Sequence, residues 1–192
     1  KLITLTTDEL GQAHYSYVGD ELVTYQTGEG LPLPTADGDV VAPGEYTIRD
    51  ESADPVAVSE PFTVLARDDV PDESAYEQEV GDGFGYVTMR DGVTLSINVR
   101  LPGPVEDGPY PTVIEYSGYD PSNPDSPQPG TLIASAFGFA TVGVNMRGTG
   151  CSGGVFDVFS PAQQADGYDV VEAVARQPWV LHNKVGMVGL SY

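Results

Sequence analysis

The stretch Lys184-Val185-Gly186-Met187-Val188-Gly189-Leu190-Ser191-Tyr192 joins a short apolar run to the first four residues of a Gly-x-Ser-x-Gly pattern. The apolar run predicts a buried strand, and the glycine and serine after it predict a tight turn. In a nucleophile elbow, a junction of this kind exposes the seryl oxygen above the end of a sheet. We therefore expect an α/β fold in which Ser191, at the end of a strand, is the candidate nucleophile.

A second serine, Ser152, also satisfies the pattern within Gly150-Cys151-Ser152-Gly153-Gly154. It lies in a glycine-rich loop beyond the strand predicted over 139–146, and no helix begins directly after it. An elbow requires a strand, a turn and a helix in immediate succession. The context therefore favours Ser191 as the nucleophile and Ser152 as a loop residue.

The composition restricts the possible partners. The chain has 29 acidic and 8 basic residues, a net charge of −21 at pH 7 and a pI near 4.1. Because such a surface repels nucleic acid and anionic membranes, neither is expected as a partner. No apolar run reaches membrane-spanning length, and no signal-peptide pattern follows Lys1. The acidic, lysine-poor surface suits an extracellular or a halophilic protein, although simple solvation explains it equally well. We expect a secreted or cell-envelope location.

The sequence gives no reason to expect a cofactor. Its single cysteine, Cys151, excludes an internal disulfide, and the glycines around it do not predict a metal site. Asp37-Gly38-Asp39 is similar to a fragment of a calcium loop, but the remaining ligand spacing is absent. We expect a β-turn there, and we expect neither a metal nor another cofactor.

Three regions follow one another along the chain. Residues 1–66 predict a small, partial β-sandwich, because short β-prone runs recur there between glycine and proline turns. Residues 67–82 predict an acidic linker, since seven of the sixteen are Asp or Glu. Residues 83–192 predict an α/β sheet, because strand-like and helix-like runs alternate after an initial hairpin.

The expected elements of the third region can be placed by their apolar spacing. A hairpin is predicted around Asp91-Gly92, between strands over 86–90 and 94–101. The other predicted elements are strands over 111–116, 139–146 and 184–190, and helices over 131–137 and 161–177. Ser160 can cap the longer helix, Pro161 suits its first turn and Pro178 ends it.

Six motifs occur in a fixed order within this third region. They are Met89-Arg90-Asp91-Gly92-Val93-Thr94-Leu95, Gly118-Tyr119-Asp120, Asn145-Met146-Arg147-Gly148-Thr149-Gly150 with Ser152-Gly153-Gly154, Asp166-Gly167-Tyr168-Asp169, Gln177-Pro178-Trp179 and Val185-Gly186-Met187-Val188-Gly189-Leu190-Ser191-Tyr192. Together they resemble the cocaine esterase and X-prolyl dipeptidyl-peptidase family of α/β-hydrolases. The resemblance implies that residues 83–192 form the N-terminal half of an α/β-hydrolase sheet. The preceding β module, which is similar to an immunoglobulin-like domain, is an addition to the usual family plan.

The resemblance also implies a reaction. It implies a serine hydrolase that cleaves ester or amide bonds, X-Pro peptide bonds among them, through an acyl-enzyme on Ser191 and without a cofactor. The activating base is then a histidine held by Asp or Glu, both later in the chain than the elbow. His14 lies in the β module and His182 precedes the elbow, so neither fits. The remainder of the hydrolase polypeptide is expected to supply the base and the acid, and the 192-residue chain alone is expected to be inactive.

Two donors are expected to form the oxyanion hole. One is the backbone N–H of Tyr192, the residue after the nucleophile. The other, implied by the resemblance, is the hydroxyl of Tyr119, in the loop that follows the strand over 111–116. Arg147 is expected to have a structural role and to tie the glycine-rich loop to the next helix through Asp166 or Asp169.

The sequence is also compatible with two other interpretations. A β-sandwich and an acidic linker are common in adhesive envelope proteins, so the chain could be a non-catalytic surface-binding module. It could also be a stable but inert fragment of the hydrolase.

Overall fold

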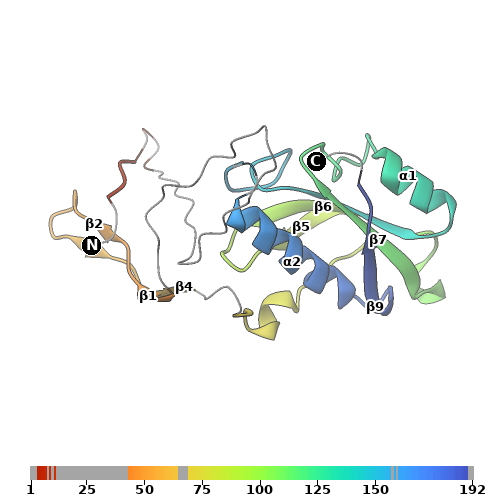
Figure 1. Cartoon of the computed structure of the whole chain (residues 1–192), viewed down its shortest axis with the longest axis horizontal. Coiled ribbons are helices and arrows are strands. Elements are labelled where there is room, and N and C mark those ends of the chain that lie inside the picture. Colours follow the sequence, from red (N-terminus) through yellow and green to blue (C-terminus); the bar gives the residue numbers. More distant parts are fainter. Residues whose placement is uncertain are drawn as a thin grey trace, which may run out of the picture. The chain divides into compact units, whose positions relative to one another are not determined.

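The fold is that of a computed structural model, which describes residues 4–7, 9, 11, 43–64, 69–156, 158 and 160–189 (Figure 1). The chain divides into two compact units, residues 1–70 and residues 71–192, and each is described by itself. The predicted nucleophile Ser191 and the predicted donor Tyr192 lie outside the described residues, as does His14.

Two antiparallel strand pairs make up the described secondary structure of the first unit. β1 (Gly44–Tyr46) pairs with β4 (Phe62–Val64), and β2 (Arg49–Asp50) pairs with β3 (Ala57–Val58). The rings of Tyr46 and Phe62, which are opposite each other in the β1–β4 register, contact at a centroid distance of 6.3 Å. Residues 12–42 lie outside the described part of the chain, so the β-sandwich stays a prediction.

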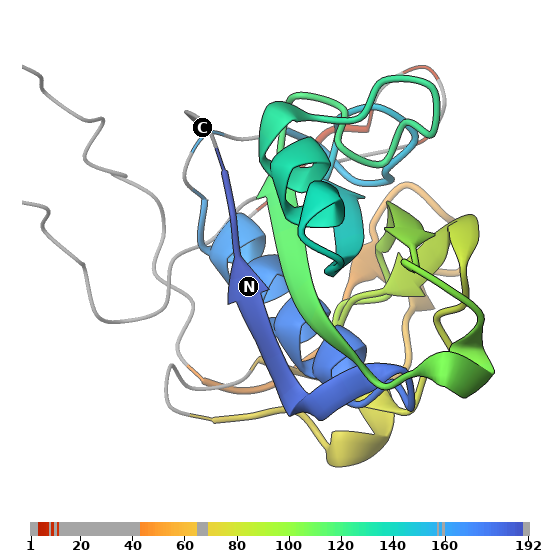
Figure 2. The same ribbon diagram turned by 90° about the vertical axis from the view of Figure 1, so that its right-hand side faces the viewer.

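A five-stranded mixed sheet forms the centre of the second unit (Figure 2), and it confirms the predicted α/β class. Its strand order is β5 (Gly83–Thr88), β6 (Thr94–Arg100), β8 (Ala140–Asn145), β7 (Tyr110–Ser117) and β9 (Val180–Met187). β5 and β6 form the predicted antiparallel hairpin, and β6 is also antiparallel to β8. β8, β7 and β9 run parallel to one another. Every residue of β8 is buried, as expected for a central strand covered on both faces.

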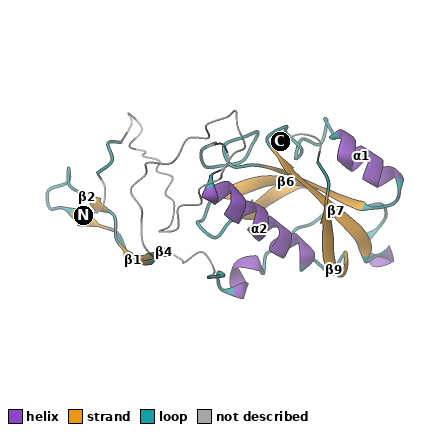
Figure 3. Ribbon diagram, viewed as in Figure 1, coloured by secondary structure: helices purple, strands orange, loops and turns teal. Residues whose placement is uncertain are grey.

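Two helices, shown in purple in Figure 3, connect the parallel strands and cover opposite faces of the sheet. α1 (Pro129–Ala136) links β7 to β8, and α2 (Pro161–Ala175) links β8 to β9. The backbone of α1 approaches the side chain of Glu115, whereas the backbone of α2 approaches the ring of the next residue, Tyr116. Successive side chains of a strand point to opposite faces, so the sheet lies between the two helices.

The start of α2 follows the predicted pattern. The hydroxyl of Ser160 accepts a hydrogen bond from the backbone N–H of Gln163 at 3.3 Å, and Pro161 occupies the first turn. This arrangement satisfies one of the N–H groups that a helix leaves unpaired at its start. The predicted capping of the helix is therefore confirmed, and the helix ends two residues before the predicted boundary.

The last strand differs from the prediction at both ends. β9 begins at Val180, four residues earlier than expected, because Val180 is buried and pairs with Tyr110 at the start of β7. His182 and Asn183 lie at an irregularity inside the strand, where both residues have left-handed backbone angles (φ 57° and 53°). The strand ends at Met187, three residues before the predicted boundary.

The predicted acidic linker over 67–82 is wrong for its second part. Residues 71–82 belong to the second unit, and Tyr76 and Val80 are buried there. Tyr76 ends the short 3-10 helix η1 (Glu73–Tyr76), and its hydroxyl donates to Asp169 of α2 at 3.0 Å. The indole N–H of Trp179 donates to the carbonyl of Val80 at 2.8 Å. The many acidic residues of this segment indicated a linker, but the buried side chains of Tyr76 and Val80 anchor it to the second unit.

We predict that Tyr76→Phe lowers the free energy of unfolding of the second unit by about 1–3 kcal/mol, because a buried hydrogen bond to a charged acceptor is lost. Urea denaturation followed by the fluorescence of Trp179, the chain's one tryptophan, measures this unit alone. Tyr86→Phe, at an exposed tyrosine of β5, is the matched control and should change stability little. Equal effects of the two substitutions would contradict the anchoring role of Tyr76.

Candidate active site

The candidate site lies where the three parallel strands end. β7 ends at Ser117, β8 at Asn145 and β9 at Met187, and Figure 2 shows β7 and β9 running in the same direction. Beyond β9 the chain stays beside β7, since the backbone N–H of Val188 donates to the carbonyl of Ile114 at 2.9 Å. In open α/β sheets, ligands bind outside the carboxyl ends of the strands. Ser191 follows Val188 by three residues in the sequence and lies outside the described residues, so its place at this edge stays a prediction.

The loop after β7, residues 118–128, is called the tyrosine loop here because it carries Tyr119. The backbone N–H of Tyr119 donates to the hydroxyl of Ser117 at 3.3 Å, and its carbonyl accepts from the side-chain amide of Gln128 at 2.8 Å. Its side chain is 53% exposed. The backbone of Tyr119 is thus held on both sides, while its side chain is exposed. Its oxyanion role stays a prediction, because Ser191 and Tyr192 lie outside the described residues.

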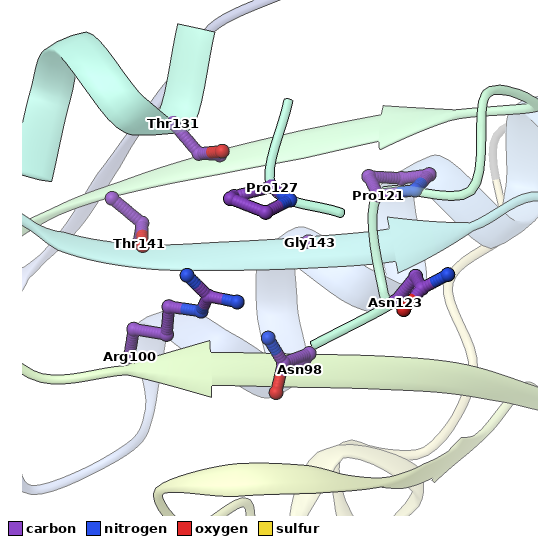
Figure 4. Close-up of a pocket in the computed structure, with 8 residues that line it drawn as sticks. All are labelled: Asn98, Arg100, Pro121, Asn123, Pro127, Thr131, Thr141 and Gly143. Atoms are coloured by element: carbon purple, nitrogen blue, oxygen red, sulfur yellow. The ribbon is translucent and has the colours of Figure 1, made fainter. Parts of the chain in front are cut away.

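The tyrosine loop rests on the sheet. Figure 4 shows Pro121, Asn123 and Pro127 of this loop above β8 and β6, around a small polar cavity. The cavity has a volume of about 10 Å³, which is close to the space that one water molecule needs. Arg100 of β6 donates a hydrogen bond to the carbonyl of Pro124, which ties the outer part of the loop to the sheet.

The glycine loop, residues 147–154, follows β8 and folds back onto the sheet. The N–H of Gly148 donates to the carbonyl of Gly153 at 2.8 Å, and the N–H of Gly153 donates to the carbonyl of Thr94 at 2.8 Å. The hydroxyl of Ser152 donates to the carbonyl of Asn145 at 2.8 Å and accepts from the backbone N–H of Ser96 at 2.9 Å. The hydroxyl of Ser152 is therefore engaged in holding the loop, and the prediction that Ser152 is a loop residue is confirmed.

Arg147 has the structural role that the sequence predicts. Its Nε and Nη2 donate to the two carboxylate oxygens of Asp166 at 2.7 and 2.5 Å, and its Nη1 donates to Asp91 at 2.9 Å. Burial by itself lowers the pKa of Arg147, but the hydrogen bonds to Asp166 and Asp91 outweigh burial and raise it, so the guanidinium stays charged. Of Asp166 and Asp169, the two partners expected in the next helix, Asp166 is the one that Arg147 contacts. The pairing fixes the start of the glycine loop to α2.

Asp169 belongs to a separate buried cluster. Its carboxylate accepts from the guanidinium of Arg90 at 2.7 Å, from the backbone N–H of Arg90 at 3.0 Å and from the hydroxyl of Tyr76 at 3.0 Å. Burial and the hydrogen bond to Asp169 raise the pKa of Tyr76 to about 12, so Tyr76 stays a neutral donor. Every contact of this cluster joins elements of the fold, so its role is structural.

Glu115 is a buried carboxylic acid near the site that the sequence analysis did not single out. It is 3% exposed, and its Oε2 has no hydrogen-bond partner within the described residues. A Cβ placed on Gly130 of α1 would lie 3.4 Å from this Oε2 and 3.4 Å from the side chain of Val188. Burial raises the pKa of Glu115, although a hydrogen bond from the backbone of Thr131 opposes the rise. Its position within the apolar strand predicted over 111–116 is the sequence feature that could have identified Glu115 as a buried acid.

Among the described residues, no group of three or more His, Cys, Asp or Glu could hold a metal ion. None of the described helices is long and apolar enough to span a membrane.

His182 is exposed and lies near the start of β9, at the edge of the sheet opposite the candidate site. It is therefore away from the carboxyl ends of the parallel strands, where the candidate site is placed.

Comparison with known proteins gives one family match and several relatives. A family model described as X-Pro dipeptidyl-peptidase (S15 family) matches residues 91–192. A protein of Mycobacterium bovis named "Putative serine esterase" is 31% identical over 146 residues, which cover 64% of this chain and 23% of that protein. A protein of Mycobacterium tuberculosis with the same description has the same identity and coverage.

Solved structures are similar to about half of the chain. A CocE/NonD family hydrolase from Staphylococcus aureus is 28% identical with a TM-score of 0.48, over 55% of this chain and 22% of that one. An esterase of Pyrococcus furiosus is 20% identical with a TM-score of 0.44, over 54% of this chain and 40% of that one. The chain thus spans about a quarter of the length of the curated relatives it matches.

We predict that Glu115→Gln makes the second unit more stable than the wild type at pH 7. The pKa of Glu115 is raised in the folded state, so ionisation of this buried group costs stability as the pH rises above its ordinary pKa of 4.5. A neutral amide avoids that cost, and the difference should shrink as the pH falls below that value. Urea denaturation at several pH values measures it.

Glu106→Gln is the control for this series, because Glu106 is exposed. Its effect on stability should be small at every pH. A Glu115→Gln variant that is less stable than the wild type at pH 7 would show that the charged carboxylate stabilises the fold.

Proposed function

Because the chain belongs to the X-Pro dipeptidyl-peptidase (S15) family, we propose that it holds the nucleophile and the oxyanion hole of a serine hydrolase, with Ser191 as the nucleophile. The family consists of hydrolases, and the sheet of the second unit is the N-terminal half of an α/β-hydrolase sheet. Because the chain spans only part of its relatives, the activity of the complete protein belongs to the proposal.

The observation that carries the proposal is the parallel arrangement of β8, β7 and β9. It directs the carboxyl ends of the three strands to one edge, where the tyrosine loop follows β7 and the glycine loop follows β8. Val188, three residues before Ser191 in the sequence, still bonds to Ile114 of β7. A serine at this junction meets the main geometric demand of a nucleophile elbow. Ser152, the other serine in a Gly-x-Ser pattern, has its hydroxyl tied to Asn145 and Ser96.

The proposed reaction is acyl transfer to Ser191 followed by hydrolysis. The Ser191 oxygen attacks the carbonyl carbon of an ester or amide while a histidine base takes its proton, and the carbonyl oxygen becomes an oxyanion. Collapse of the tetrahedral intermediate expels the alcohol or amine, which receives the proton from the same histidine. Water then hydrolyses the acyl-enzyme by the same steps and releases the acid.

Two groups of this chain are proposed to stabilise the oxyanion. They are the backbone N–H of Tyr192 and the hydroxyl of Tyr119. The fixed backbone and exposed side chain of Tyr119 support its role, because a donor that does not reorganise during the reaction lowers the barrier most.

The histidine base and its acidic partner are proposed to come from the remainder of the polypeptide. His182 lies at the opposite edge of the sheet, and in this fold both residues follow the nucleophile in the chain. The proposed substrates are small esters, amides or X-Pro peptides, and the acidic surface supports a secreted or cell-envelope location.

We predict that a fluorophosphonate labels the complete protein at Ser191. Peptide mapping by mass spectrometry identifies the labelled residue, and Ser191→Ala should abolish both labelling and turnover, because no other nucleophile can replace it. Ser152→Ala is the matched control and should retain the label, although it loses three hydrogen bonds and some stability. A label on Ser152, or no label on the folded protein, would overturn the assignment.

A further inference from the structure

The tyrosine loop contains a strained residue next to the proposed oxyanion donor. Asp120 has a left-handed backbone conformation (φ 64°) between Tyr119 and Pro121. This conformation is uncommon for residues other than glycine, and it persists where the surroundings hold it in place. The direction of the chain at Tyr119 therefore depends on the contacts that fix Asp120.

One of these contacts comes from Asn145 at the end of β8. Asn145 is fully buried, and its Nδ2 donates to the Asp120 carboxylate at 3.1 Å. Its Oδ1 accepts from the backbone N–H of Ser122 at 2.9 Å. One amide thus grips the tyrosine loop on both sides of Pro121. The other carboxylate oxygen of Asp120 accepts from Asn123 at 3.0 Å.

Two glycines make room for this grip. A Cβ on Gly150 would lie 2.1 Å from the Asn145 Nδ2 and 2.7 Å from the Asp120 carboxylate. A Cβ on Gly143 of β8 would lie 1.9 Å from the carbonyl oxygen of Pro121. Any side chain at either position would push the tyrosine loop off the sheet. β8 and the glycine loop therefore each leave room, at Gly143 and Gly150, for the tyrosine loop to pack closely against the sheet.

We propose that Asn145, acting through Asp120, is a positioning residue that fixes the direction in which Tyr119 presents its hydroxyl to the reacting carbonyl. The inference rests on the proposed oxyanion role of Tyr119. The amide of Asn145 satisfies a carboxylate on one side and a backbone N–H on the other, so the buried group is fully paired. The donor is then in place before the oxyanion develops, which is the condition under which it lowers the barrier.

Exchanging the amide and the carboxylate between Asn145 and Asp120 tests this role. Asn145→Asp keeps the shape but places two carboxylates within hydrogen-bond distance, where they repel. Adding Asp120→Asn restores an amide opposite a carboxylate. In that double variant the carboxylate at position 145 can still accept from Ser122, and the amide at position 120 can donate to this carboxylate while accepting from Asn123. An asparagine also tolerates the left-handed backbone at position 120.

The experiment measures kcat and KM for an ester substrate with the complete protein. Asn145→Asp should lower kcat by roughly tenfold or more, up to the 10²–10³-fold cost of losing an oxyanion donor, with little change in KM. The Asp120→Asn/Asn145→Asp exchange should recover most of that loss. Asn183→Asp is the matched control, because it makes the same chemical change at a left-handed residue on the opposite edge of the sheet, and it should leave kcat unchanged.

Repeating the series with Tyr119→Phe separates the positioning role from a general loss of structure. If Asn145 acts through Tyr119, Asn145→Asp should lower kcat by less than about threefold in the Tyr119→Phe protein, since coupled residues are not additive. An equal loss in both backgrounds, or no recovery in a folded exchange variant, would overturn the inference. If Tyr119→Phe alone leaves kcat unchanged, the proposed oxyanion role of Tyr119 fails first, and the inference falls with it.

Discussion

The parallel pairing of β7 with β8 on one side and β9 on the other is the constraint on which the rest of the second unit depends. It brings the carboxyl ends of three strands to one edge, although the residues involved lie far apart in the sequence. The tyrosine loop, the glycine loop and the path toward Ser191 all begin at this edge. The chemistry proposed here requires that these three segments be held still, because a nucleophile and its oxyanion donors act from fixed positions.

Buried polar contacts hold the loops at this edge. Arg147 fixes the glycine loop to α2 through Asp166, and Asn145 fixes the tyrosine loop through Asp120 and Ser122. Removing one partner of such a contact leaves the other buried and unsatisfied, which costs more than the contact itself contributes. The site is therefore rigid in position and sensitive to single substitutions.

The sequence predicted the parts of the fold that depend on local chemistry. The hairpin, the capped start of α2 at Ser160 and the role of Arg147 follow from turn, cap and charge patterns, and the family and the α/β-hydrolase class followed from motif order. Composition misled at residues 71–82, where charges outnumber the two apolar anchors, Tyr76 and Val80. The grip of Asn145 on the tyrosine loop was not predicted, because it depends on a strand order that spacing along the chain does not specify.

The most direct test is a crystal structure of the complete protein inhibited by a fluorophosphonate, whose phosphoryl oxygen stands in for the oxyanion. We expect a bond from phosphorus to the Ser191 oxygen at the carboxyl edge of β9. We also expect the phosphoryl oxygen to lie within hydrogen-bond distance of the Tyr119 hydroxyl and the Tyr192 N–H. A phosphonate on another residue would contradict the assignment of the nucleophile, and a phosphoryl oxygen that faces neither donor would contradict the proposed oxyanion hole.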